Sequence, residues 1–168
     1  MNLTELNGLS QADFTAALAG IFEHSPWIPE ATWPRRPFAS VDELHAQMCA
    51  TLAAADLDAK LALIRAHPEL AGKLAIRGEL TDASLREQAG AGLNQCSPEE
   101  FSRLTELNAA YIARFGFPFI LAVRGHDRDS IIANMAARVA NEREVEIATA
   151  LAQIERIAGF RLGDLVAA

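Results

Sequence analysis

The chain of 168 residues contains little cysteine and no long apolar run. Its two cysteines, Cys49 and Cys96, form no C-x-x-C pair, so we expect two reduced thiols rather than a disulfide or a catalytic nucleophile. The longest apolar stretch, residues 115–123, is interrupted by Gly116 and Pro118, whereas a membrane-spanning helix needs about 20 apolar residues. The sequence therefore predicts a protein without a membrane segment or a structural metal.

Basic residues are also scarce, with 15 Lys and Arg against 22 Asp and Glu and a formal net charge of −7. An acidic chain without a basic block binds nucleic acids and anionic membranes poorly, so neither is an expected partner. Glycine-rich phosphate-binding motifs, H-E-x-x-H and G-x-S-x-G are absent, and the four histidines lack metal-ligand spacing. The first ten residues contain no basic cluster and do not resemble a signal peptide, so we expect a cytoplasmic protein.

Helical signals recur along the chain, whereas no segment shows the sustained alternation of a half-buried strand. We therefore predict an all-α fold, a single compact domain of about seven or eight helices over residues 1–168. Residues that can cap a helix N-terminus precede apolar residues at helical spacing. These capping residues are Ser10, Ser40, Asp56, Thr81 or Asp82, Ser97, Asp127 or Asp129, and Asn141.

Proline and glycine predict where several helices end. Pro68 disfavours helical geometry at His67, and Gly116 is a natural C-terminal stop. The first long helix is expected to carry its apolar face as far as Phe22. The last helix is expected to end at Gly159, or to form one long bent helix with the helix that precedes it.

Two stretches look irregular. Residues 24–39 contain four prolines, which we expect to exclude a helix, together with three aromatic residues. The prediction is an ordered loop that its aromatic side chains fold over the core, with a pocket wall or a subunit interface as the alternative. Residues 117–120, Phe-Pro-Phe-Ile, predict either a buried connection or a place where main-chain amides face a ligand.

Three polar residues share one face of the predicted helix that follows Thr81. Ser84, Glu87 and Gln88 have the spacing i, i+3 and i+4, and together they could hold a small polar ligand at several points. The alternative is a solvated polar stripe. Another face is expected to hold this helix to the core, through Leu85, Ala89 and Leu93.

A histidine and an arginine are the other candidates for chemistry. The proline after His67 fixes its backbone, and an unperturbed imidazole pKa of about 6.5 suits proton transfer, the alternative being a surface or capping histidine. Arg161 could grip a carboxylate or a ureido carbonyl through two parallel hydrogen bonds, or act only as a favourable cation near a helix C-terminus. Of the other histidines, His24 is a weaker candidate, His45 is expected to be structural, and His126 is expected to be exposed.

Several of these residues belong to separated motifs. The motifs are Glu23-His24-Ser25-Pro26-Trp27, Ala66-His67-Pro68-Glu69-Leu70, Leu80-Thr81 with Ser84 and Glu87-Gln88-Ala89-Gly90-Ala91-Gly92-Leu93, Phe115-Gly116-Phe117-Pro118-Phe119-Ile120, and Arg161-Leu162. In this order they resemble the family of 2-oxo-4-hydroxy-4-carboxy-5-ureidoimidazoline (OHCU) decarboxylases, the last enzymes of the route from urate to allantoin. The similarity spans residues 9–165.

The resemblance implies an all-α homodimer with a small-molecule substrate and no metal or organic cofactor, which converts OHCU to (S)-allantoin and CO2. It implies that His67 is the catalytic histidine and that Glu87 is its polar partner. By the same matching, the substrate-binding residues are Pro68, Ser84, Gln88, Phe119 and Ile120 through their backbone, and Arg161. Glu69 stands where Asp is common in the family, and the missing peroxisomal tail favours a bacterial-type cytoplasmic enzyme.

Two rival functions remain open from the sequence. In a helical protein-interaction module, residues 24–39 and 117–120 would form a partner surface, which predicts an exposed apolar patch. The hypothesis of an interaction module also predicts that no single cavity joins His67, Glu87 and Arg161. The other rival is an enzyme that acts on a related ureido acid.

Overall fold

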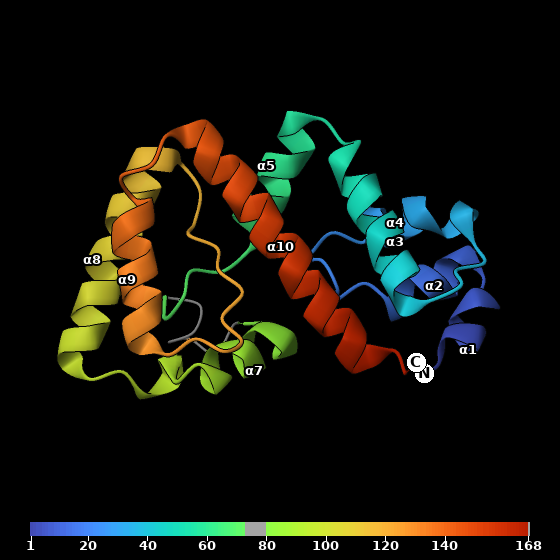
Figure 1. Ribbon diagram of the computed structural model, residues 1–168, viewed down its shortest axis with the longest axis horizontal. Helices are drawn as coiled ribbons and strands as arrows, with labels where there is room; N and C mark the ends of the chain where they lie inside the picture. Colours follow the sequence, from blue (N-terminus) through green and yellow to red (C-terminus); the bar gives the residue numbers. More distant parts are fainter. Residues whose placement is uncertain (73–79, 168) are drawn as a thin grey trace. The chain divides into compact units, whose positions relative to one another are not determined.

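The computed structural model describes residues 1–72 and 80–167 and confirms the all-α fold (Figure 1). The described residues form nine α-helices, two short 3-10 helices and one isolated β-bridge, with no strand among them. The helices are slightly more numerous than expected because the proline-rich segment is itself helical. In the described part of the chain no helix combines the length and the apolar character that crossing a bilayer requires.

The fold divides into two compact units. The first unit is Met1–Ala66 together with the described residues from Ile154 onward, and the second unit is His67–Gln153. The helices of the first unit are α1 (Leu3–Asn7), α2 (Gln11–Ala17), α3 (Trp27–Thr32), η1 (Trp33–Arg35), α4 (Val41–Ala53), α5 (Leu57–Ala66) and the C-terminal part of α10 (Arg143–Leu165). Those of the second unit are α7 (Asp82–Gly90), η2 (Leu93–Gln95), α8 (Pro98–Phe115), α9 (Arg128–Arg138) and the start of α10.

The first unit has an apolar core supplied by several short helices. Its fully buried side chains are Leu6, Phe14, Leu18, Ile28, Leu44, Met48, Ile64 and Leu162. Ser10 and Ser40 cap α2 and α4 as expected, each by accepting a hydrogen bond from the main-chain N–H three residues on. The two ends of the chain meet in this unit, where Ala167 N donates to Met1 O at 2.9 Å (Figure 1).

The prediction that prolines exclude a helix from residues 24–39 is wrong. Pro26 occupies the N-cap of α3, and Pro29 lies in its first turn, where a main-chain N–H has no partner within the helix. Pro34 likewise lies at the start of η1. The expected burial of an aromatic side chain is confirmed at Phe38, whose ring stacks on Phe14 at 6.1 Å.

Two other helix boundaries differ from the predictions. α2 ends at Ala17, so the buried side chain of Phe22 reaches the core from a turn rather than from a helix. α10 passes through Gly159, where a Cβ would lie 3.3 Å from the ring of His45. This glycine therefore makes room for a neighbouring side chain rather than ending the helix. His45 also bonds to Glu155 O at 2.7 Å, which confirms its structural role.

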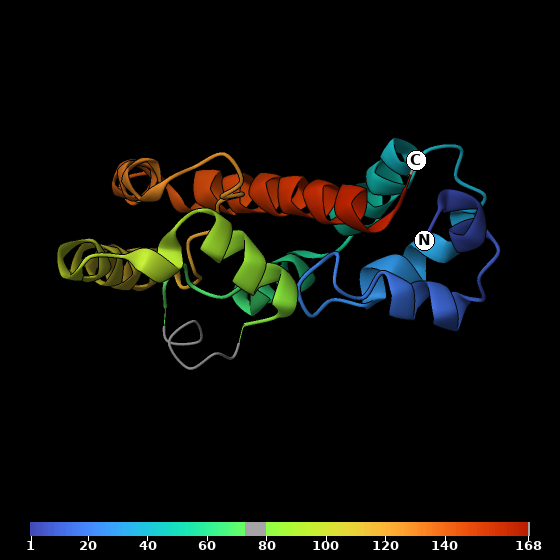
Figure 2. The same cartoon turned by 90° about the horizontal axis from the view of Figure 1, so that it is seen from below.

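In the second unit, α8 and α9 pack against each other (Figure 2). Each begins where the sequence predicted, with capping boxes at Ser97 and Asp127, and α8 ends at Gly116, whose φ of +78° is left-handed. α9 and α10 are separate helices, which excludes the alternative of one bent helix. The aromatic rings of Tyr111, Phe115, Phe117 and Phe119 form the centre of this unit.

Candidate active site

His67 lies in a turn that begins where α5 ends. α5 stops at Ala66, as the following Pro68 predicts, and the His67 side chain is buried with 8% of its surface exposed. A surface histidine is therefore excluded. In the next turn Ala71 has a positive φ of 52°, a conformation that costs a residue with a Cβ about 1 kcal/mol or more. Such a turn persists only where its surroundings hold it.

Two buried amide side chains hold this turn. Gln88 Oε1 accepts from Ala71 N at 2.9 Å, and its Nε2 donates to Glu69 O at 3.4 Å. Asn108 Nδ2 of α8 donates to Leu70 O at 2.9 Å. The backbone that follows His67 is thus fixed to both α7 and α8, and the predicted Gln88 lies directly beside the predicted histidine turn.

The polar face of α7 points inward. Ser84 and Gln88 are only 4% and 5% exposed, and Glu87 is half-buried, so these residues do not form a solvated stripe. The predicted apolar anchor of this helix is wrong for Leu85 and Ala89, because Leu85 is 50% exposed and Ala89 is exposed as well. Hydrogen bonds to the histidine turn, rather than apolar burial, hold this face of α7 in place.

The outward apolar residues of α7 border a half-open pocket of about 470 Å³. Its lining consists of Ala71, Leu80, Leu85, Gln88, Ala89, Leu93, Asn94, Cys96, Ser97, Pro98 and Phe101. None of these described lining residues is charged, and Gln88 is the only one predicted to bind substrate.

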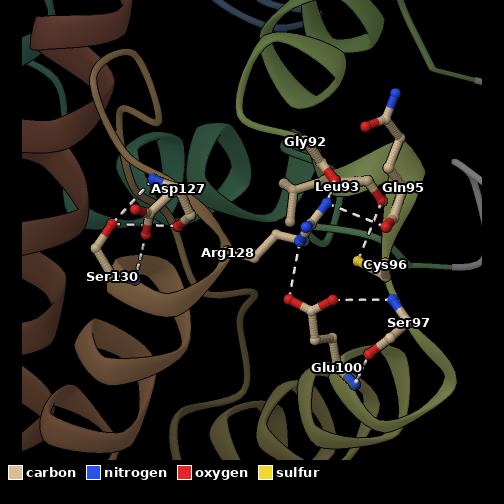
Figure 3. A network of polar contacts seen from close by, with 9 residues as sticks. All are labelled: Gly92, Leu93, Gln95, Cys96, Ser97, Glu100, Asp127, Arg128 and Ser130. Atoms are coloured by element: carbon tan, nitrogen blue, oxygen red, sulfur yellow. Dashed lines mark hydrogen bonds and ion pairs between the residues drawn. The ribbon is translucent and has the colours of Figure 1, made fainter.

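An arginine network ties the end of α7 to α8 (Figure 3). Arg128 Nη1 donates to Gly92 O at 3.1 Å and to Gln95 O at 3.0 Å, and its Nε donates to Glu100 Oε2 at 2.8 Å. Glu100 also accepts from Ser97 N. That main-chain bond is the main cause that lowers the pKa of the Glu100 carboxyl, and the Ser97 side chain and the Arg128 guanidinium lower it further. The helix that carries Ser84, Glu87 and Gln88 is thus anchored at its C-terminal end.

The predicted backbone contributors, Phe119 and Ile120, lie in a buried non-helical segment. Ile120 O accepts from Arg138 Nη1 at 2.6 Å, and the ring of Phe119 lies under the same guanidinium. The main-chain N–H groups of Phe119 and Ile120 donate no hydrogen bond within residues 1–72 and 80–167. Such N–H groups are suited to a polar ligand.

Arg161 lies in the first unit, on α10. Its guanidinium is buried and donates through Nη1 to Glu23 Oε2 at 2.8 Å and to Gly20 O at 3.0 Å. Arg161 is therefore more than a favourable charge at a helix end, because a buried carboxylate orients it. The other predicted site residues belong to the second unit, so their convergence with Arg161 stays a prediction.

Several buried polar groups around these residues were not predicted as site residues. Glu23, Asn108, Arg138 and Glu146 are all at least nine-tenths buried. A signal was present for two of them. Asn108 follows Leu104 and Arg138 follows Ile131 and Met135 at helical spacing, so each places a polar group on an apolar stripe.

The remaining histidines are less buried than His67. His24 has an exposed side chain, and His126 is partly buried, rather than exposed as predicted, with Nδ1 3.0 Å from Ser130 Oγ. Within the described ranges, no three His, Cys, Asp or Glu side chains gather in a way that could hold a metal ion.

Together these features define an all-α protein that buries a histidine turn against a polar helix face and orients a buried arginine with a carboxylate. Comparison with known proteins identifies this class. The model of the OHCU decarboxylase family matches residues 7–163. The chain therefore belongs to the OHCU decarboxylase family.

Similar proteins come from distant organisms. The chain is 38% identical to a putative OHCU decarboxylase of Homo sapiens, in a match that covers 100% of this chain and 97% of the human protein. It is 40% identical to an OHCU decarboxylase of Haloferax volcanii, in a match that covers 98% of this chain and 95% of that protein. It is 42% identical over 98% of its length to the uric acid degradation bifunctional protein PucL of Bacillus subtilis. In that comparison the chain spans 32% of the longer protein.

Two solved structures are also similar. A crystal structure of (S)-allantoin synthase has a TM-score of 0.79 and 32% identity, and the match covers 99% of this chain and 54% of that one. An OHCU decarboxylase crystallised in the presence of (S)-allantoin has a TM-score of 0.72 over 89% of this chain and 96% of the other. At 19% identity, the second likeness concerns the fold alone.

Proposed function

We propose that the chain is a cofactor-independent decarboxylase that converts OHCU to (S)-allantoin and CO2 in urate degradation. The observation that carries this proposal is the family match over residues 7–163, with human and archaeal relatives of nearly the same length named for OHCU decarboxylation. The match crosses both units, which supports one functional domain over residues 1–168. An enzyme for a related ureido acid remains the alternative, and turnover of such acids in place of OHCU would favour it.

The chemistry of this substrate needs no external electron sink. The carboxylate lies β to a ring C=N bond, so the electron pair of the breaking carbon–carboxylate bond flows toward the imine nitrogen as CO2 leaves. That ring nitrogen gains a proton, the resulting enol loses its hydroxyl proton, and the ring carbon that bears the ureido group gains a proton. The protein has to hold the carboxylate out of the ring plane, move these protons and select the face that is protonated.

His67 and Glu87 are proposed to act at the reacting atoms. His67 would accept and return the proton that moves as CO2 is lost, with its backbone held by the Gln88 and Asn108 bonds to the turn that follows it. Glu87 lies half-buried on α7, one residue before Gln88, and would bind the ring hydroxyl or tune His67.

The other predicted residues are proposed to bind and orient the substrate. Buried Ser84 and Gln88 offer a hydroxyl and an amide, Pro68 shapes the wall next to His67, and Phe119 and Ile120 offer main-chain N–H groups. Arg161 would grip the carboxylate or the ureido carbonyl, with its orientation set by Glu23. A bidentate arginine and fixed main-chain donors would make the bound geometry rigid.

The product provides the first test. OHCU also decays without an enzyme, so the measurement must follow both rate and handedness. The wild-type chain is expected to form optically pure (S)-allantoin faster than the background, as followed by circular dichroism of the product. Racemic allantoin at the background rate would refute the proposed function.

The role of His67 is tested by His67→Gln. General acid–base catalysis contributes about 10²–10⁴-fold, so kcat is expected to fall by at least that much with the fold intact. His126→Gln is the matched control, since its ring bonds only to Ser130 among the partners seen, and it should keep wild-type turnover. Near-normal activity of His67→Gln would remove His67 from the catalytic step.

We also propose that the chain is a homodimer in the cytoplasm. The family resemblance supports the dimer, and the two free thiols, Cys49 and Cys96, suit a reducing compartment. Light scattering coupled to size exclusion should give a mass of about twice 18.1 kDa. A monomer at micromolar concentration would contradict the dimer and leave the proposed chemistry untouched.

A further inference from the structure

A buried cluster of polar side chains lies in the second unit, where α9 approaches the start of α10. The carboxylate of Glu146 accepts three hydrogen bonds, from Arg138 Nε (2.8 Å) and the Tyr111 hydroxyl (2.6 Å) at Oε1 and from Asn141 Nδ2 (3.0 Å) at Oε2. The Glu146 side chain is fully buried, and that of Arg138 is 9% exposed. We call these four residues the Glu146 cluster.

A buried ion pair of this kind is a weak source of stability. Taking two charges out of water costs free energy that their mutual attraction only partly returns, and apolar residues of similar volume often serve a core as well or better. Burial of Arg138 costs further free energy, because its Nη2 is buried without a hydrogen-bond partner in the part of the chain that the structure describes. What Arg138 contacts outside the cluster is therefore informative.

Outside the cluster, Arg138 holds the segment predicted to present its backbone to the substrate. Its Nη1 donates to Ile120 O at 2.6 Å, and its guanidinium carbon lies 4.3 Å from the ring centroid of Phe119. The same ring packs edge-on against Tyr111, whose hydroxyl belongs to the cluster, at 5.4 Å. One guanidinium thus fixes both the carbonyl of Ile120 and the side chain of Phe119.

We propose that Arg138 is a positioning residue of the decarboxylase site. Glu146 orients its guanidinium, and the guanidinium fixes the Phe119–Ile120 backbone. The N–H groups of that backbone, which have no partner among residues 1–72 and 80–167, are thereby aimed at the substrate. The proposal rests on the proposed function for its catalytic part, whereas the anchoring of the segment can be measured without substrate.

The test uses Arg138→Lys, with Glu146→Gln as a second variant. A lysine keeps the charge but lacks the planar guanidinium. It therefore cannot donate to both Glu146 and Ile120 O while lying over the ring of Phe119. Glu146→Gln keeps an oxygen that can accept from Tyr111 and Arg138 but removes the charge that orients the guanidinium. Arg138→Lys is expected to lower kcat/KM by about 10–100-fold, the effect of displacing a binding group by roughly an ångström. It should also reduce the optical purity of the allantoin formed.

Arg114→Lys is the matched control. Arg114 also donates to a main-chain carbonyl, that of Asn141, at 2.9 and 3.1 Å and also lies over a ring, that of Phe115, at 5.3 Å. It is exposed, and its hydrogen bonds to described residues go to the main-chain carbonyl of Asn141, not to the Asn141 side chain that bonds Glu146 and not to residues 119–120. Hydrogen exchange of the amides of residues 117–123, measured without substrate, should become faster in Arg138→Lys and stay unchanged in Arg114→Lys.

The outcomes separate this inference from the proposed function. Faster exchange in residues 117–123 together with lower kcat/KM and lower optical purity supports the positioning role. An active wild type with an Arg138→Lys variant of unchanged kcat/KM and optical purity overturns it and leaves the proposed function standing. An inactive wild type refutes both the proposed function and this catalytic role, whatever the exchange shows. If Arg138→Lys does not fold, Glu146→Gln is judged by the same measurements.

Discussion

The buried ion pair between Arg161 and Glu23 gives the most direct test of how the first unit holds its predicted substrate arginine. The two side chains are 7% and 2% exposed, and Nη1 lies 2.8 Å from Oε2. Glu23→Ala leaves a guanidinium charge buried without this carboxylate. Breaking a buried pair in this way costs about 3–5 kcal/mol. For a chain of this length each kcal/mol lowers Tm by roughly 2–4 °C, so we expect a loss of roughly 6–20 °C.

Thermal unfolding followed by circular dichroism at 222 nm measures this loss, with urea unfolding as a second measure of the free energy. Glu30→Ala is the matched control, since Glu30 is an exposed glutamate on α3, and its Tm should stay close to wild type. The double variant Glu23→Gln with Arg161→Met removes both charges and should recover part of the loss. A Glu23→Ala variant that unfolds within one or two degrees of wild type would refute the reasoning.

Four further outcomes follow from particular positions in the structure. Gly116→Ala should cost about 1–2 kcal/mol in urea unfolding, since φ is +78° and its Cβ would meet open space. Gly92→Ala should cost more, because φ is +80° and its Cβ would lie 3.3 Å from Arg128 Nη1. An equal or smaller loss would contradict the close packing of Gly92 in the arginine network of Figure 3. Burial, followed by the charge of Glu155, raises the pKa of the Cys49 thiol from 9.0 to about 12, so alkylation by iodoacetamide at pH 8 should be slow in the folded protein. Because the folded protein keeps this thiol protonated where the unfolded chain ionises, the free energy of unfolding should fall as the pH rises from 9 toward 12, and Cys49→Ser should show a shallower fall.

The helix boundaries that the sequence predicted well are those with local causes. At Ser40 and Ser97 a side-chain oxygen bonds to the N–H three residues on, so the signal and the contact lie within one turn. Pro68 and Gly116 act on their own backbone or that of a neighbour, and both helices end where expected. No packing partner has to be known for such a prediction.

The boundaries and faces that were predicted wrongly depend on partners far along the chain. Gly159 looks like a helix stop, but the ring of His45, more than a hundred residues away, explains why a small residue stands there. Leu85 was expected inside because apolar residues usually face the core, whereas hydrogen bonds from Gln88 to the histidine turn direct the other face of α7 inward. Spacing alone does not distinguish the two orientations of such a helix.

In the candidate site too, features with local causes were predicted and features that depend on distant residues were not. The shared helix face of Ser84 and Gln88 follows from helix periodicity and was predicted. Its burial depends on the bonds of Gln88 to the histidine turn and was left open by the sequence. The supporting residues were not predicted, because Asn108 meets the histidine turn from 38 residues along the chain and Glu23 meets Arg161 from 138 residues away. When two residues so far apart in sequence are in contact, the only local signal is a polar residue within an apolar stripe.

The orientation of α7 has a consequence for local unfolding of the protein. Its buried side chains are those of Ser84 and Gln88, so this helix removes little apolar surface from water and gains its hold from a few hydrogen bonds. Segments with few buried apolar contacts detach by local unfolding at low free energy while the remaining fold persists. α7 is therefore the helix of the second unit that we expect proteases to cleave first, and occupancy of the site would protect it.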